Sequence, residues 1–253
     1  MVLNLIDEAL NLLRAGVRIV SEIGDVRERA THLRLIAEAF EDLGFRDEAR
    51  EILLEASRIA MKIEDVEERI EELKIIANQL RFSGFLEDSI EILEEGIRSL
   101  EKEEDPRMKL EGYVQIVDEL MDAKALDVAR ELIYKITQIL LALRDAEVEN
   151  PDILIDAFKM IVVFEKGEAL KEILSIILYK IEEIENEEIR NDLLLDLTSI
   201  LMRIGWLDEA KEIILNRITS PELKIEGIIK FSDYVTSHIE KLREFTFEYE
   251  IEE

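Results

Sequence analysis

The side chains best suited to chemistry are few and widely separated in this 253-residue chain. The two histidines, His32 and His238, have no HExxH or ExxH partner that would form a metal pair on one helix face. Cysteine is absent, which excludes thiolate nucleophiles and disulfides. The sequence also has no P-loop, GxGxxG or GxSxG motif. We therefore predict no catalytic, cofactor-binding or metal-binding residue, and interpret both histidines as ordinary helix residues.

Acidic side chains dominate the charge, with 60 Asp and Glu against 32 Lys and Arg and a formal net charge of −28. Carboxylates are so frequent that some pair must lie close by chance, so paired acids carry little information about catalysis. Such a surface repels nucleic-acid phosphates and anionic lipid headgroups and attracts basic protein segments. The alternative is a charged surface that only keeps the protein soluble. We predict a basic or amphipathic protein or peptide partner, and neither nucleic acid nor membrane.

The N-terminal stretch "MVLNLIDEALNLL" carries two acids and no basic leader, and no apolar run approaches the roughly 20 residues of a membrane helix. We therefore predict a cytoplasmic protein. Glutamine occurs only at positions 79, 115 and 138, whereas Glu, Ile, Lys and Arg are abundant. This composition is typical of heat-adapted proteins with surface ion-pair networks.

A repeat with a period near 40 residues organises the chain. Its anchor positions are Asn4, Gly44, Gly84, Lys124, Glu165 and Gly205. Before each later anchor, apolar residues recur at helical spacing, as in Leu33, Ile36, Ala37 and Phe40. Small polar N-cap residues precede these helices, and Pro106, Pro151 and Pro221 each follow such a cap. The pattern predicts an all-α array of helix pairs, with an A helix before each anchor and a B helix after it.

The segment "AEAFEDLGFRDEAREILLEA" resembles the tetratricopeptide repeat, whose glycine and two alanines match Gly44, Ala49 and Ala56. The period is near 40 rather than 34, the proline that usually closes helix B is missing, and the fourth and sixth units depart further. The resemblance implies an α-α superhelix, a right-handed solenoid of about six tandem antiparallel helix pairs over residues 1–243. It also implies that the A helices line a concave groove that binds peptides or proteins.

With that groove geometry, side chains of the first three A helices would face a ligand. These predicted groove residues are Arg34, Glu38, Glu41, Lys74, Asn78, Arg81, Val114, Asp118 and Met121. The first and third of these helices present acidic faces and the second carries the basic pair Lys74 and Arg81, so the groove is mixed in sign. A basic amphipathic segment is the expected ligand class. The alternative is a solvated face without a ligand.

The fourth A helix, "ILIDAFKMIVVF", is apolar on nearly every side. Ile155, Val162 and Val163 are predicted to point into the groove, where they form a candidate apolar interface. Either the array covers them internally, or a partner or a second copy docks there.

The tail at residues 244–253, "EFTFEYEIEE", alternates apolar and polar residues, which is strand periodicity. It could pair with a second copy, extend a partner's sheet, lie along the groove or fray.

Taken together, these features predict a noncatalytic adaptor or scaffold that holds another protein in its groove. The alternative is a self-assembling structural or regulatory subunit. A third possibility is an enzyme with a site built from groove carboxylates, which would show a strongly shifted carboxylate in a closed pocket.

Overall fold

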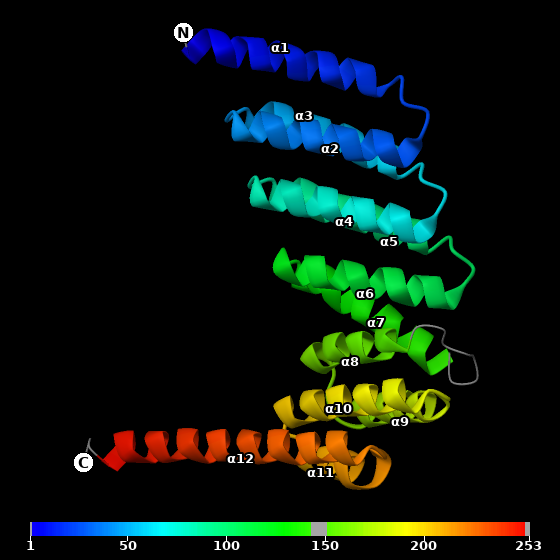
Figure 1. Ribbon diagram of the computed structural model, residues 1–253, viewed down its shortest axis with the longest axis vertical. Helices are drawn as coiled ribbons and strands as arrows, with labels where there is room; N and C mark the ends of the chain where they lie inside the picture. The colour runs from blue at the N-terminus through cyan, green and yellow to red at the C-terminus, as the bar shows by residue number, and fades with distance from the viewer. Residues whose placement is uncertain (1, 143–150, 251–253) are drawn as a thin grey trace. The chain divides into compact units, whose positions relative to one another are not determined.

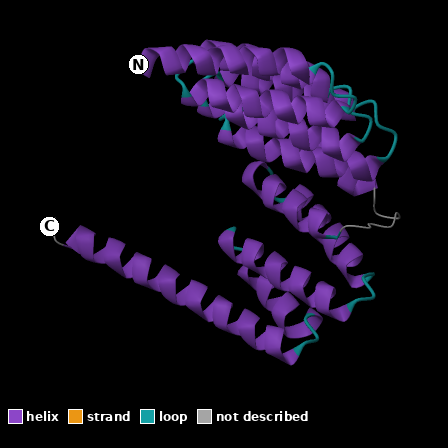
Figure 2. Ribbon diagram, turned by 45° about the horizontal axis from the view of Figure 1, so that its top comes forward, coloured by secondary structure: helices purple, strands orange, loops and turns teal. Residues whose placement is uncertain are grey.

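The computed structural model describes the backbone of residues 2–142 and 151–250, and the side chains of residues 5–142 and 151–239. The described backbone is helical apart from short loops and contains no strand (Figure 2). The prediction of an all-α chain of helix pairs is therefore confirmed. The helices are α1 (Val2–Val20), α2 (Val26–Asp42), α3 (Arg46–Ala60), α4 (Val66–Phe82), α5 (Leu86–Leu100), α6 (Pro106–Asp122), α7 (Leu126–Ala142), α8 (Asp152–Phe164), α9 (Glu168–Glu182), α10 (Glu187–Arg203), α11 (Leu207–Glu212), continued by the π-helical turn η2 (Ile213–Arg217), and α12 (Pro221–Glu250).

Two compact units divide the chain, Met1–Ile139 and Leu140–Glu253. In the first unit, the A helices contact one another in chain order, α2 with α4 and α4 with α6 (Figure 1). The B helices α3 and α5 each pack against the A helix before them and the A helix after them. In the second unit, α8 packs with α9, and α10 packs with α8, α9, α11 and α12.

The helix starts follow the predicted caps. The Asp25 carboxylate accepts the Glu28 backbone N–H at 2.8 Å, and Asp65 accepts that of Glu68 at 2.9 Å. Asp105, Asn186 and Ser220 accept backbone N–H groups in the same way. Pro106 and Pro221 are the first residues of α6 and α12, whereas Pro151 directly precedes α8.

The anchor residues reverse the chain in a left-handed conformation. Gly44, Gly84 and Gly205 have φ of 86°, 94° and 80°. Lys124 takes the same role at φ 58° without being glycine, so the repeat imposes this turn on an unfavourable residue type. Glu165 has φ −100°, and the positive φ moves to Gly167. The fourth turn therefore differs from the others.

The apolar stripes of the A helices form the core. Equivalent residues eight positions after the N-cap, Leu33, Leu73, Tyr113 and Leu194, are at most 3% exposed. Burying a large apolar side chain contributes about 1.5–3 kcal/mol to folding. Because the A helices also contact the neighbouring pairs, stacking adds to the free energy that each pair gains from its own packing.

The strand predicted for residues 244–253 is wrong over the part that the structure describes, because α12 continues as helix to Glu250. The sequence also places Phe245 and Tyr249 four residues apart, so it satisfies helical as well as alternating spacing. The rest of the tail, residues 251–253, lies outside the described residues.

Within the described helices, none is both long enough and apolar enough to cross a membrane.

Candidate protein-binding surface

The predicted groove residues other than Val114 lie on the outward sides of α2, α4 and α6, which we call the A face. Its members are Arg34, Leu35, Glu38, Glu41 and Asp42 on α2; Lys74, Ile75, Asn78, Arg81 and Phe82 on α4; and Gln115, Asp118, Met121 and Asp122 on α6. The three helices succeed one another in space in chain order (Figure 1), so these residues form one continuous surface within the first unit.

A ladder of polar contacts joins α2 to α4 along this surface. The Arg34 guanidinium donates from Nε to Glu72 Oε1 at 3.2 Å, and the Thr31 hydroxyl donates to Glu72 Oε2 at 3.3 Å. The side chains of Arg34 and Glu72 are only 17% and 5% exposed. At the N-terminal end, Arg27 pairs with Glu68 and Glu71 of α4 at 2.5 and 2.8 Å. Burying a carboxyl without hydrogen-bond partners is costly. Helix α2 offsets this cost at Glu72, because it supplies a donor to each of the two carboxyl oxygens.

The same ladder continues from α4 to α6. Lys74 Nζ donates to Gln115 Oε1 at 3.3 Å, and Arg81 Nη2 donates to Asp122 Oδ2 at 3.3 Å and to Asn78 Oδ1 at 2.8 Å. Four contacts of the ladder join residues 41 apart: Arg27 with Glu68, Thr31 with Glu72, Lys74 with Gln115, and Arg81 with Asp122. The A helices are thus held in one constant register.

This ladder changes the charge that the A face offers to a ligand. All three cations among the predicted groove residues, Arg34, Lys74 and Arg81, already contact a neighbouring A helix. Glu38 and Asp118 are exposed and Glu41 is half-buried, and none of them pairs with a cation in the described part of the chain. The A face is therefore more acidic in effect than its composition suggests.

Apolar side chains lie among these acids. Leu35 is 48% exposed and Phe82 is 77% exposed. The Arg81 guanidinium carbon lies 4.5 Å from the centroid of the Phe82 ring, within cation–π range. Ile75 and Met121 are half-buried. A ligand with both apolar and cationic side chains would be complementary to this surface.

Glu119, on α6 beside the A face, is held in a different environment. Its Oε2 lies 4.0 Å from Arg81 Nη2 and has no hydrogen-bond partner. Burial is the main cause that raises the pKa of this carboxyl above its ordinary value, and Lys74 and Arg81 oppose the shift. We assign no chemistry to this group.

Val114 does not belong to the A face, because it is only 5% exposed. Its equivalents Arg34 and Lys74 lie at the margin where neighbouring A helices meet, and their long chains reach across that margin. A valine at this position stays between the helices. This part of the groove prediction is therefore wrong.

The three residues of the apolar interface predicted on α8 differ in exposure. Ile155 is 2% exposed and belongs to the core, so it is not an interface residue. In the repeat register of the sequence it is equivalent to Ile70 and Leu110, and those residues are buried too. Val162 is half-buried and Val163 is 53% exposed. A single exposed valine is ordinary on a protein surface.

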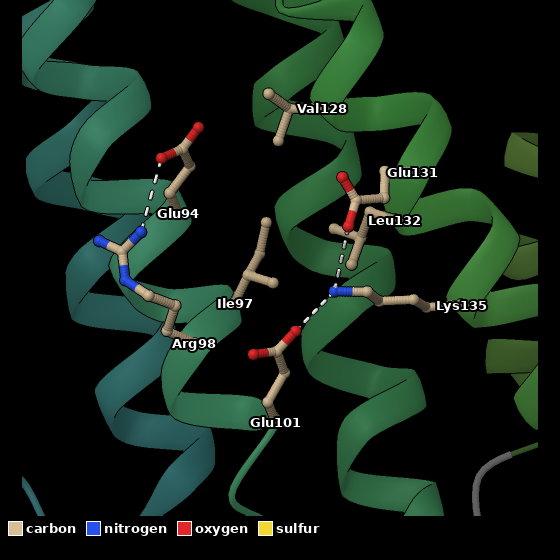
Figure 3. Close-up of a pocket in the computed structure, with 8 residues that line it drawn as sticks. All are labelled: Glu94, Ile97, Arg98, Glu101, Val128, Glu131, Leu132 and Lys135. Carbon is tan, nitrogen blue, oxygen red and sulfur yellow. Dashed lines mark hydrogen bonds and ion pairs between the residues drawn. The ribbon is translucent and has the colours of Figure 1, made fainter.

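A cleft lies between the B helices α5 and α7 of the first unit (Figure 3). Ile97 and Leu132 line it with Val128, and Glu101 accepts a hydrogen bond from Lys135 at 2.6 Å. This bond is the main cause that raises the pKa of Lys135. The volume is about 190 Å³, which is below the roughly 300 Å³ of typical ligand pockets. Its lysine is paired, so the cleft is a weaker candidate than the A face.

The histidines occupy ordinary helix positions. His32 Nδ1 lies 2.6 Å from the Glu28 backbone oxygen, and the His238 ring stacks on Tyr234 at 4.7 Å. No group of three or more His, Asp or Glu among the described residues could hold a metal ion.

Sequence reasoning missed Leu35 and the cleft. The position of Leu35 was available from helical spacing, since it follows Thr31 by four residues and precedes Glu38 by three. The cleft had no such signal, because it depends on the spacing between α5 and α7.

The sequence matches no family model and no curated protein. Among solved structures, it is similar to the crystal structure of Ton1535 from Thermococcus onnurineus NA1, with 16% identity, 87% of this chain and 84% of that chain covered, and a TM-score of 0.38. It is also similar to a circular tandem repeat protein with novel repeat topology and enhanced subunit contact surfaces, with 16% identity, 94% and 60% covered, and a TM-score of 0.22. At these TM-scores, neither likeness supports a conclusion about this chain.

Proposed function

We propose that this protein is a noncatalytic interaction module, an adaptor or scaffold, that binds a basic amphipathic segment of a partner protein on its A face. The observation that carries the proposal is that the cations of this surface have partners on neighbouring helices, whereas several of its acids, in the described part of the chain, do not. Arg34 and Arg81 form ion pairs with neighbouring A helices, and Lys74 donates to the neutral Gln115 side chain. Among the described residues, Glu38, Glu41 and Asp118 have no cation partner, and they lie beside exposed Leu35 and Phe82. We further propose the tetratricopeptide-like, right-handed superhelix as the finer architecture, supported by the left-handed turns at Gly44 and Gly84.

An amphipathic ligand fits this arrangement for two physical reasons. Cationic side chains would gain Coulomb attraction from unpaired carboxylates without displacing an existing partner. Apolar side chains of the ligand would cover the exposed side chains of Leu35 and Phe82. Removing this apolar surface from water contributes about 25 cal/mol to the binding free energy for each Å² buried. Long-range attraction by the net charge of −28 would also speed association at low salt.

The test uses a labelled model peptide of about 20 residues with leucine on one helical face and lysine on the other. A second peptide with glutamate in place of lysine is the ligand control. Binding is measured by fluorescence anisotropy to the full chain and to the variant Glu38→Lys, Glu41→Lys, Asp118→Lys. We expect the triple variant to lose at least about tenfold in affinity for the lysine peptide, which corresponds to 1.4 kcal/mol.

A matched variant separates local binding from general charge attraction. Glu51, Glu55 and Glu91 are exposed on the B helices α3 and α5, so their replacement by lysine changes the net charge equally. The proposal predicts that this control retains most of its affinity. Equal loss in both triple variants would show nonspecific attraction, and unchanged affinity in the first would remove the A face from consideration.

A further inference from the structure

Helix α1 carries an exposed apolar stripe. Leu5, Leu12 and Ile19 are 60%, 74% and 58% exposed and lie seven residues apart, which places them on one side of the helix. Ala9 and Gly16 lie between them on the same side and would let another helix approach closely. Helix α1 packs mainly against α2, and its Arg14 also lies 3.8 Å from Glu48 of α3.

The repeat shows what this stripe does elsewhere in the chain. Residues equivalent to Leu12 in the later B helices are Ile52, Ile92, Leu132, Ile173 and Ile213, and all are at most 9% exposed. The small residues Gly96 of α5 and Gly16 of α1, which are equivalent in the repeat, also differ in how many helices surround them. A Cβ on Gly96 would lie within 4 Å of Ile116 in the next A helix and of Ile70 and Leu73 in its own A helix. Among the described residues, a Cβ on Gly16 would meet only Ile36 of α2.

Helix α12 exposes the complementary half of a helix pair. Ile225 and Ile228 lie five and eight residues after the N-cap Ser220 and are 59% and 47% exposed. In α4, the equivalent residues are Ile70 and Leu73, the two that contact Gly96 of the paired B helix. Both are 1% exposed. Thus α12 is an A helix whose B-binding stripe is uncovered, and α1 is a B helix whose A-binding stripe is uncovered.

The segments that carry the two stripes have little net charge of their own. Helix α1 carries two acids and two arginines, and residues 221–239 of α12 carry three acids and two lysines. The chain as a whole has a net charge of −28, so most of its surface repels a second copy. These two stripes are instead apolar, although α12 as a whole, over Pro221–Glu250, carries seven acids and four basic residues.

We propose that α12 of one copy packs against α1 of a second copy and completes a helix pair like that of α4 and α5. Ile225 and Ile228 would then lie against Gly16 and Leu12, as Ile70 and Leu73 lie against Gly96. The contact joins two different surfaces, so it is head-to-tail and produces rings or open chains. It does not depend on the A face, so the two proposals stand or fall separately.

The experiment measures solution mass by size exclusion with light scattering over a range of concentrations. The full chain, of 29.4 kDa, should form species larger than a monomer as concentration rises. Leu12→Glu damages the α1 stripe, and Ile228→Glu damages the α12 stripe. Each variant alone should be monomeric. An equimolar mixture should form a heterodimer and stop there, because one intact stripe of each variant remains to pair.

Each other result overturns the proposal. If Ile228→Glu alone still associates while Leu12→Glu does not, then α1 pairs with α1. If the full chain stays monomeric at all concentrations, or if the mixture stays monomeric, then another occupant covers the stripes. Leu126→Glu, an equally drastic change at a 50% exposed residue of α7, is the control and should associate normally. Circular dichroism checks folding, and Leu5→Glu and Ile225→Glu replace any variant that unfolds.

Discussion

The Arg34 guanidinium of α2 and the Glu72 carboxylate of α4 form an ion pair at 3.2 Å, although Glu72 is almost fully buried. A buried carboxylate without a cation is costly, so removing the arginine should destabilise more than the pair itself stabilises. We expect Arg34→Ala to lower the free energy of unfolding by about 3 kcal/mol, measured by urea denaturation.

Two control experiments test whether the loss of stability in Arg34→Ala comes from leaving a buried carboxylate without its cation. Lys135 pairs with Glu101 between α5 and α7, but these side chains are 30% and 49% exposed, so Lys135→Ala should cost at most about 1 kcal/mol. Replacing both partners, as Arg34→Met with Glu72→Leu, should recover most of the loss. An Arg34→Ala protein as stable as the parent would show that Glu72 is solvated in solution.

Glu119 makes stability depend on pH in a defined direction. Its folded-state pKa is raised, mainly by burial, so the fold favours the protonated form. The stability it contributes is present below the unfolded-state pKa of about 4.3 and is lost as pH rises through the folded-state pKa. Glu119→Gln should therefore be more stable than the parent at about pH 7, and this advantage should shrink toward about pH 4.

Glu119→Met, which is also uncharged, should show the same pH dependence of the difference. Urea midpoints for the three proteins at both pH values provide the check. An advantage that grows on acidification would contradict the assigned direction.

Lys124 occupies a turn conformation that glycine occupies in three other units. At φ 58°, an L-residue with a side chain is strained by about 1–2 kcal/mol, and glycine is not. Because glycine also gains more freedom in the unfolded chain, we expect Lys124→Gly to stabilise by about 0.5–1 kcal/mol. The reverse change, Gly84→Ala at φ 94°, should destabilise by a similar amount. Thermal unfolding of both variants tests these predictions. The melting temperature should rise for Lys124→Gly and fall for Gly84→Ala.

Gly112 of α6 is needed for close packing against α5. A Cβ at this position would lie 2.6 Å from both δ carbons of Leu100, which is fully buried. The overpacking cost of about 1–3 kcal/mol exceeds the gain of about 1 kcal/mol from alanine's helix propensity. We expect Gly112→Ala to be about 1 kcal/mol less stable than the parent. Gly24→Ala, with no atom within 4 Å of the new Cβ, is the control and should not be destabilised.

The sequence by itself determined the local architecture. Helix starts at Asp25 and Asp65, and the left-handed turns at Gly44 and Gly84, depend on backbone groups within a few residues of each other. Such features are encoded in residue type and order. Lys124 occupies the equivalent repeat position, but its left-handed conformation came only from the structure, because its residue type does not favour it.

Tertiary structure decided which residues are available to a partner. Leu12 and Ile52 occupy the same repeat position, yet they are 74% and 9% exposed, because burial depends on which helix packs alongside. The cations Arg34 and Lys74 looked available for a ligand until the neighbouring A helix supplied their partners. Val114 and Ile155 were predicted at the surface but are buried, because neighbouring helices pack over them. Spacing along one helix indicates a face, but only the packing of a second helix decides whether that face meets water.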